Sequence, residues 1–116
     1  MKKILIINNN VDTMNLLKGW LEKKDYKVKF TVHDQEVPDV INEFAPDLLL
    51  IDVHQVNVLK ELKSLVHSKE IPAILMTGNT VIDHHKFINL ADDVIEKPFN
   101  PKLLEKKIGK FLKDTA

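Results

Sequence analysis

Asp52, Thr77 and Lys97 each stand at the end of a short apolar run, and together they could act on a phosphoryl group. A carboxylate can be phosphorylated as a nucleophile, to give an acyl phosphate. A hydroxyl can donate a hydrogen bond to a phosphate oxygen, and a lysine ammonium offsets the added negative charge. Asp52 and Lys97 alone would favour a structural ion pair at a sheet edge. Thr77, followed by Gly78, shifts the interpretation towards phosphoryl chemistry.

The elements that must position these residues alternate along the whole chain. Short apolar runs typical of strands are followed by segments of helical period. The predicted strands cover residues 4–7, 28–32, 48–51, 72–77 and 94–95. The predicted helices cover residues 12–21, 38–44, 58–66, 81–90 and 100–113. This alternation predicts a doubly wound α/β fold, a parallel sheet with helices on both faces. The alternating polarity of residues 28–32 indicates an edge or half-exposed strand.

Two of the predicted helices have a defined apolar face, and the first also has a predicted start. In the first, Asp12 is expected to be the N-cap. Its expected inward residues are Leu16, Leu17, Trp20 and Leu21. In the last helix the expected inward residues are Leu103, Leu104, Ile108, Phe111 and Leu112. The lysines Lys102, Lys106, Lys110 and Lys113 are expected to form its solvated outer face.

The polar residues that follow the strands should converge. In open parallel sheets, ligands bind at the carboxyl ends of the strands, near the point where the strand order reverses. Asn8, Asn9, Asp52, Thr77 and Lys97 all fall at such ends. The sequence therefore predicts one polar site at this edge of the sheet, whatever family the chain belongs to.

Four motifs in this order resemble the receiver domain of response regulators, the CheY-like family. They are Asp52, Thr77-Gly78, Ala91-Asp92-Asp93 and Lys97-Pro98-Phe99. The resemblance spans the chain and implies a single receiver domain over residues 1–116. It also implies a flavodoxin-like, three-layer fold with a five-stranded sheet in the order 2-1-3-4-5. By resemblance, Asp52 is the phosphoacceptor, and Thr77 and Lys97 assist it.

The chain departs from the family at the metal site. Family members end their first strand with two acidic residues that hold Mg²⁺, whereas this chain has Asn8 and Asn9. The ligand positions implied by the family are Asp52, Asn9 and the backbone carbonyl of His54. Mg²⁺ usually binds through one or two carboxylates, waters and phosphate. Because only Asp52 supplies a carboxylate, we expect Mg²⁺ binding to be much weaker than in a typical receiver. Asp12 is interpreted as a helix cap rather than as a replacement ligand.

Two further departures concern the loop after Asp52 and the switch. The loop that contains His54 is roughly four or five residues shorter than in the family, where connections of about 2–6 residues are ordinary. Family members also often carry an aromatic residue three positions before the lysine, and this residue couples to the threonine. Here that position is Val94. The expected Thr77–Val94 switch is therefore altered, although a bistable element is needed to transmit a local charge change.

Composition narrows the class of protein. The chain has 17 basic and 17 acidic residues and no cysteine. The balanced charge argues against a dedicated nucleic-acid or membrane-surface binder. Apolar runs fall short of the roughly 18 residues that indicate a membrane span. The expected location is the cytoplasm, and no enzyme is predicted.

Two functions fit these residues, and a third shares only the fold. The first is an atypical receiver that acts as a protein-interaction module with little dependence on phosphorylation. The second is a working phosphoacceptor, with Asp52 phosphorylated by a histidine kinase or a small donor. The third, a flavodoxin-like cofactor-binding protein, lacks any feature that recognises a flavin. By resemblance, a histidine kinase or other signalling protein would contact the face formed by helix 81–90, strand 94–95 and the last helix. The protein is expected to be a monomer or a weak dimer.

Overall fold

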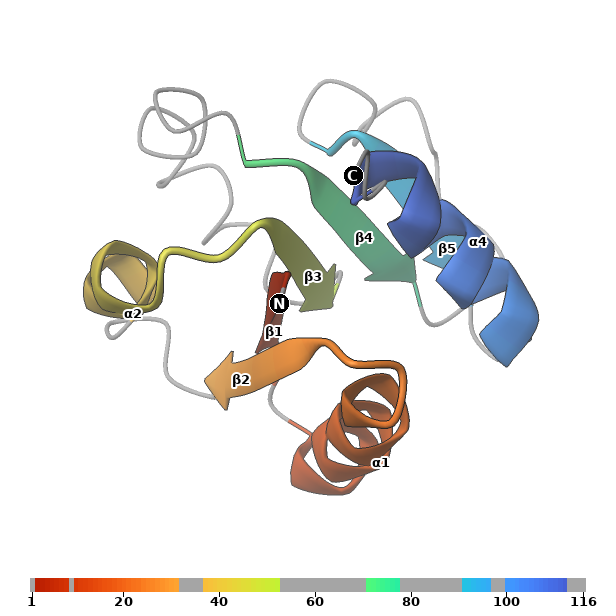
Figure 1. Ribbon diagram of the computed structural model, residues 1–116, viewed down its shortest axis with the longest axis horizontal. Helices are drawn as coiled ribbons and strands as arrows, with labels where there is room; N and C mark the ends of the chain where they lie inside the picture. The colour runs from red at the N-terminus through yellow and green to blue at the C-terminus, as the bar shows by residue number, and fades with distance from the viewer. Residues whose placement is uncertain are drawn as a thin grey trace.

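The computed structural model describes residues 2–8, 10–31, 37–52, 71–77, 91–96 and 100–112, without the side chain of Thr77. Its centre is a five-stranded parallel sheet with the order β2-β1-β3-β4-β5 (Figure 1). The strands are β1 Lys3–Ile7, β2 Lys27–Thr31, β3 Leu48–Asp52, β4 Ala73–Thr77 and β5 Asp93–Glu96. The predicted fold class and strand order are confirmed, and β2 lies at an edge as its alternating pattern indicated.

Helices cover both faces of the sheet. The described helices are α1 Val11–Glu22, α2 Val37–Phe44 and α4 Pro101–Phe111. Figure 1 shows α1 and α4 on one face of the sheet and α2 on the other. The helices predicted over residues 58–66 and 81–90 lie outside the described residues. The layers that can be followed are those of the predicted αβα arrangement.

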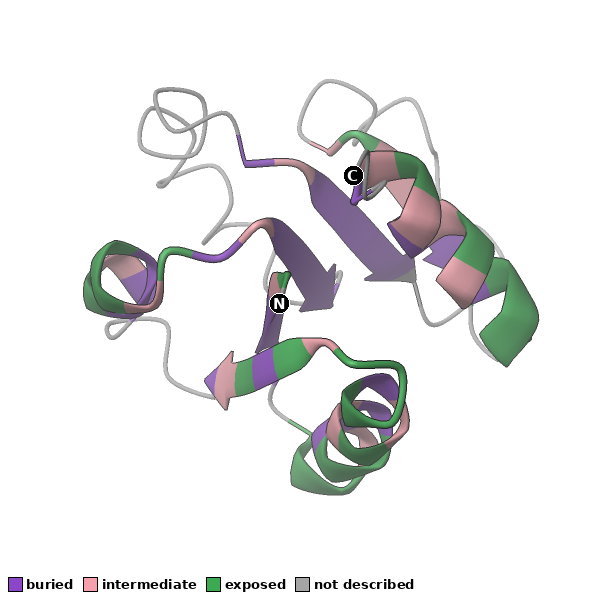
Figure 2. Cartoon of the chain, in the orientation of Figure 1, coloured by how far each residue is buried: buried purple, intermediate pink, exposed green. Residues whose placement is uncertain are grey.

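Two apolar cores separate the sheet from these helices. The first core joins Ile6, Leu50 and Met76 of the sheet to α1 and α4, and the second joins Ile7 and Ile51 to α2. Successive strand residues point to opposite faces, so β1 and β3 contribute to both cores. All five residues of β3 are buried (Figure 2). The central strand is therefore covered on both sides, as a continuous apolar run predicts.

The N-cap of helix α1 lies two residues before the predicted cap. Asn10 is the N-cap, and its Oδ1 accepts a hydrogen bond from the backbone N–H of Thr13 at 3.0 Å. Asp12 lies in the first turn instead, so its assignment as the cap was wrong. The helix buries Met14, Leu17 and Leu21, while Leu16 is 75% exposed. The assignment of Leu16 to the inward face was also wrong, since about 100° per residue turns it away from Met14.

Helix α4 is capped by Asn100. The Oδ1 of Asn100 accepts a hydrogen bond from the N–H of Lys102 at 2.8 Å, and Pro101 occupies the first turn. Leu104 and Ile108 are fully buried at an i, i+4 spacing. Leu103 is 45% exposed, so its predicted inward position was wrong, because it lies about 100° round the helix from Leu104. Of the four lysines expected on the outer face, Lys102, Lys106 and Lys110 are exposed, and Lys113 lies outside the described residues.

Two aspartates form hydrogen bonds at the amino edge of the sheet, where the strands begin. The N–H of Lys3 donates to Oδ2 of Asp47 at 2.8 Å, and the N–H of Asp47 donates to the carbonyl of Lys3 at 2.7 Å. Asp92 forms the same reciprocal pair with Ala73, at 2.9 and 2.8 Å. Each carboxylate therefore fixes the start of a neighbouring strand, by bonds that are stronger than neutral ones.

Candidate functional site

Asp52 lies at the carboxyl edge of the sheet, where the strands end. It is the last residue of β3, is only 3% exposed, and pairs in register with Met76 of β4. Because β3 lies between β1 and β4, Asp52 is flanked by strands on both sides. A carboxylate at this depth is held in a low-dielectric setting, where charges and hydrogen-bond donors nearby act strongly.

Asn8 follows β1 at the same edge and is 1% exposed. Its backbone N–H donates to the carbonyl of Thr31 at 3.3 Å, which extends the pairing of β1 with β2. Its side-chain Oδ1 accepts a hydrogen bond from the N–H of Asn10 at 2.9 Å. Within the described part of the chain, its Nδ2 is a buried side-chain atom that has no hydrogen-bond partner. Asn8 therefore presents a satisfied acceptor and an unsatisfied donor.

The register of the sheet places Asn8 beside Asp52. Ile7 pairs with Ile51, so the next residues of the two parallel strands are neighbours. Ile6 and Leu50, two residues earlier, both point into the first core. Since strand residues two apart share a face, Asn8 and Asp52 lie on the side of the sheet that α1 and α4 cover.

The other predicted site residues are described to different extents. Thr77 ends β4 and pairs in register with Glu96 of β5, which places its backbone at the carboxyl edge. Val94 lies in β5, half-buried against the second core. Asn9, His54 and Lys97 lie outside the described residues. The structure thus brings Asn8, Asp52 and the backbone of Thr77 to one edge of the sheet.

Sequence reasoning treated Asn8 only as a missing acid and overlooked its hydrogen bonding. The run Asn8-Asn9-Asn10 just before a helix was the available signal, because asparagine favours caps and local turns. Asn10 caps α1, and Asn8 in turn accepts from the N–H of Asn10. This chain of hydrogen bonds fixes the orientation of the Asn8 amide, since only its oxygen can accept.

Of the metal-ligand positions that the family implies, only Asp52 lies among the described residues. Receiver domains generally bind Mg²⁺ at the phosphorylation site, and this cation requires oxygen ligands in near-octahedral geometry. The only oxygen of the Asn8 side chain already accepts a hydrogen bond, and its remaining polar group is a donor. Among the described residues, no group of three or more acidic, histidine or cysteine side chains could hold a metal ion.

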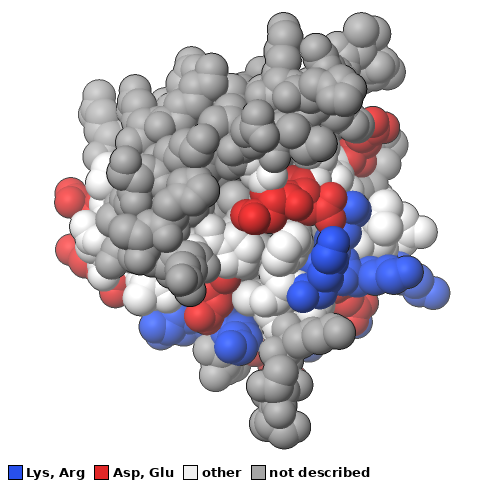
Figure 3. All heavy atoms as spheres, turned by 90° about the horizontal axis from the view of Figure 1, so that it is seen from above, with Lys and Arg blue, Asp and Glu red and all other residues white. Residues whose placement is uncertain are grey.

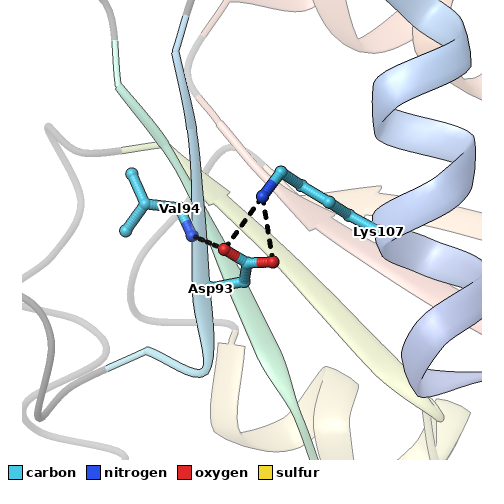
Figure 4. Close-up of polar contacts among 3 residues, drawn as sticks. All are labelled: Asp93, Val94 and Lys107. Atoms are coloured by element: carbon cyan, nitrogen blue, oxygen red, sulfur yellow. Dashed lines mark hydrogen bonds and ion pairs between the residues drawn. The ribbon is translucent and has the colours of Figure 1, made fainter.

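A second feature lies between β5 and α4, next to Val94. The Nζ of Lys107 lies 3.0 Å from both carboxylate oxygens of Asp93, and Oδ1 of Asp93 also accepts from the N–H of Val94 at 2.8 Å (Figure 4). A groove of about 560 Å³ opens beside this pair. It is lined by Asp93, Leu103, Lys106, Lys107, Gly109 and Lys110. Seen from above, the described surface carries basic as well as acidic residues (Figure 3).

The chain belongs to the response regulator receiver domain family, whose model matches residues 4–109. It is 32% identical over 117 residues to the transcriptional regulatory protein CpxR of Escherichia coli, covering 97% of this chain and 50% of CpxR. It is 27% identical to the response regulator SaeR of Staphylococcus aureus, covering 97% of this chain and 51% of SaeR. The chain thus spans about half the length of these curated relatives.

Solved structures agree with this assignment. The N-terminal domain of the nisin resistance regulator NsrR superposes with a TM-score of 0.85 at 28% identity, covering 97% of this chain and 99% of that one. The beryllofluoride-activated receiver domain of RstA from Klebsiella pneumoniae shares the fold, with a TM-score of 0.84 at 22% identity. The predicted family is confirmed, and it replaces the flavodoxin-like cofactor-binding alternative. In this family the receiver domain is a signalling module of two-component systems.

No helix in the described ranges is long and apolar enough to cross a membrane.

Proposed function

We propose that this receiver domain acts as a signalling protein-interaction module, with little dependence on Mg²⁺-assisted phosphorylation. The observation that carries the proposal is Asn8, which is buried beside Asp52 with its oxygen engaged and its Nδ2 unpartnered. A neutral donor at this position removes the charge that attracts a divalent cation and leaves no additional carboxylate to bind it. The proposal treats residues 1–116 as one domain in the cytoplasm.

Within this proposal the site residues keep the positions of the family but not its full chemistry. Asp52 holds the phosphoacceptor position, with Thr77 and Lys97 as its assisting residues. Asp52, Asn9 and the backbone carbonyl of His54 hold the metal-ligand positions, and their binding of Mg²⁺ is weak. The Thr77–Val94 switch lacks an aromatic ring, so the output depends less on a phosphoryl group at Asp52.

The proposed contact face consists of the predicted helix 81–90, β5 and α4. Receiver domains interact with histidine kinases and other signalling proteins, and a protein of this kind is the proposed partner. The groove beside the Asp93–Lys107 pair is lined by the exposed apolar side chain of Leu103 and by two exposed lysines, Lys106 and Lys110. An apolar anchor with a charged rim is a common arrangement at protein interfaces. Direct binding to nucleic acid or membrane is not part of the proposal, and the domain is a monomer or weak dimer.

The test compares variants at the pocket and at the contact face. The partner is purified after capture with the wild-type domain, and its affinity is measured for wild type, Asp52→Asn and Lys106→Glu. The proposal expects Asp52→Asn to bind within about twofold of wild type and Lys106→Glu to bind at least about fivefold more weakly. If Asp52→Asn abolishes binding while its thermal melt stays cooperative, the proposal is wrong.

A second candidate is a functional phosphoacceptor in a two-component relay. The supporting observation is that Asp52 ends the central strand at the carboxyl edge and is only 3% exposed. The test is incubation with acetyl phosphate and with histidine-kinase phosphodonors at high Mg²⁺, followed by intact-mass measurement. A gain of one phosphoryl group that Asp52→Asn removes supports this candidate. Failure of every donor to label the protein eliminates it.

A further inference from the structure

The Asn8 side chain, on which the proposed function rests, keeps a donor that calls for an acceptor. Its Nδ2 is buried and, among the described residues, has no hydrogen-bond partner. An unsatisfied buried donor is costly, so a native structure that keeps one calls for an explanation. The amide cannot rotate by half a turn to escape this, because Oδ1 must stay where it accepts from the N–H of Asn10 at 2.9 Å.

The position of the donor limits what could satisfy it. Asn8 follows β1, beside Asp52 and on the same side of the sheet, as the Ile7–Ile51 register requires. It also precedes α1 by three residues, with Asn10 as the cap between them. The amino end of a helix carries partial positive charge and favours anions. A donor and a helix amino terminus together favour an oxygen that carries negative charge.

We propose that Asn8 makes this pocket an oxyanion site that works without a metal, in which Nδ2 donates a hydrogen bond to a phosphoryl-type oxygen. The oxygen could belong to a phosphoryl group carried by Asp52 or to free phosphate, and both present the same acceptor. An amide N–H can donate to an anionic oxygen but offers no lone pair to a cation. Asn8 thus reverses the polarity of a position where the family has an acid. This inference goes beyond the interaction role: it rests on the same residue as the proposed function but is tested by a different measurement.

The test uses the full chain labelled with ¹⁵N, in EDTA, with the side-chain amide of Asn8 followed by NMR. The signal is assigned by its loss in Asn8→Ala. One arm adds inorganic phosphate, and the other adds beryllofluoride, which mimics a phosphoryl group on a carboxylate. A saturable shift of the Asn8 amide on addition of phosphate indicates that the site binds free phosphate. A shift with beryllofluoride that Asp52→Asn abolishes indicates the group carried by Asp52. Either result supports the proposal.

Variants define the size of the effect. Removing a hydrogen bond to a charged group should weaken metal-free binding about tenfold or more in Asn8→Ala. Asn8→Asp should lose metal-free binding as well, because it replaces the donor by a negative charge. Asn42→Asp, the same change at an exposed residue of α2, should bind as wild type does.

The result that would contradict the proposal is measured on the wild-type protein, so it does not depend on whether a variant folds. If the wild-type Asn8 amide shows no shift in EDTA with either ligand, the proposal is wrong and the donor is satisfied by buried water. Partner binding that survives Asp52→Asn would still support the interaction role in that case. Conversely, a shifted Asn8 amide would stand even if Asp52→Asn abolished partner binding. The two failures are therefore distinguishable.

Discussion

The two ends of the same sheet treat their polar groups differently. At the amino edge, Asp47 and Asp92 each form a reciprocal pair of hydrogen bonds with the start of a neighbouring strand. At the carboxyl edge, Asn8 keeps a buried donor without a partner among the described residues, next to the buried carboxylate of Asp52. Charged side chains at the amino edge are used for stability. The carboxyl edge retains an unsatisfied donor, and departures of this kind are expected at functional or strained sites.

The difference in burial between the two edges also explains why acidic residues are tolerated at the amino edge but are unfavourable beside Asp52. The carboxylates of Asp47 and Asp92 are only partly buried, or exposed, and each accepts a backbone N–H. A second carboxylate beside Asp52 would be buried with a like charge, which is unfavourable unless a cation binds between them. Asparagine at position 8 avoids that repulsion, because its side chain is neutral.

The largest expected effect comes from restoring an acid at the carboxyl edge. Asn8→Asp should lower the free energy of unfolding by about 3 kcal/mol without metal, because it buries a second negative charge beside Asp52. Urea unfolding at neutral pH measures the change. Asn42→Asp, at an exposed site on α2, serves as the matched control and should change stability by no more than about 0.5 kcal/mol. Equal stability of Asn8→Asp and wild type would show that the two edges do not differ as described.

At the amino edge the expected effect is somewhat smaller. Asp47→Ala should cost about 2 kcal/mol, because the N–H of Lys3 loses an ionised acceptor at a part-buried position. Asp47→Asn keeps a neutral acceptor and should cost about half as much. Urea unfolding again supplies the measurement. A loss in Asp47→Ala of less than about 0.5 kcal/mol would contradict the stabilising role of this edge.

A pH titration tests the amino edge through Tyr26, which precedes β2. Burial, and then the negative charge of Glu105, raise the pKa of Tyr26 above its ordinary value of about 10. The neutral phenol is favoured in the folded state, so its contribution to stability is complete below about pH 10 and is lost as pH rises through the raised pKa. Since the chain has one tyrosine, phenolate absorbance reports it directly.

The control for this titration is Glu105→Gln, which should bring the Tyr26 midpoint back towards its ordinary value, although burial keeps it raised. Tyr26→Phe should make the domain less sensitive to alkaline pH. A wild-type midpoint at or below that of a model phenol would contradict the partial burial of Tyr26.

The smallest expected effect concerns backbone strain in the connection that carries Asp47. Ala45 has φ of 51°, a left-handed conformation that glycine adopts without strain, and its N–H donates to the carbonyl of Ile41 at 3.0 Å. Ala45→Gly should stabilise the domain by about 0.5 kcal/mol, the relief of strain less the entropy that glycine loses on folding. Ala91→Gly should do the opposite, because the backbone there does not have a positive φ. A destabilised Ala45→Gly in thermal melts would contradict this.

The fold could be predicted from sequence because its signals are local and repeated. The runs that became β1, β3 and β4 are apolar on both faces, and the strand order followed from the family resemblance. The errors concerned which side of a helix faces the core. Placing the α1 cap at Asp12 instead of Asn10 put Leu16 in the core in place of Met14. Amphipathic period locates a helix better than it fixes which of two adjacent leucines points inward.

The site could be predicted only as a set of positions. Strand ends and register place Asn8, Asp52 and Thr77 at one edge, and this much follows from the sequence pattern. The hydrogen bond from Asn10 to Asn8, which fixes the amide, depends on the turn geometry between β1 and α1. Residue type alone does not state which end of an amide faces the pocket.

We propose that Asn8 and its neighbours make the carboxyl edge a poor site for a divalent cation. A Mg²⁺ titration of ¹⁵N-labelled protein tests this, comparing wild type with the double variant Asn8→Asp/Asn9→Asp. We expect no saturable shift at Asp52 or Thr77 in wild type at millimolar Mg²⁺, and a saturable shift in the double variant. Saturation of the wild-type protein at submillimolar Mg²⁺ would show that this edge binds the cation in spite of Asn8.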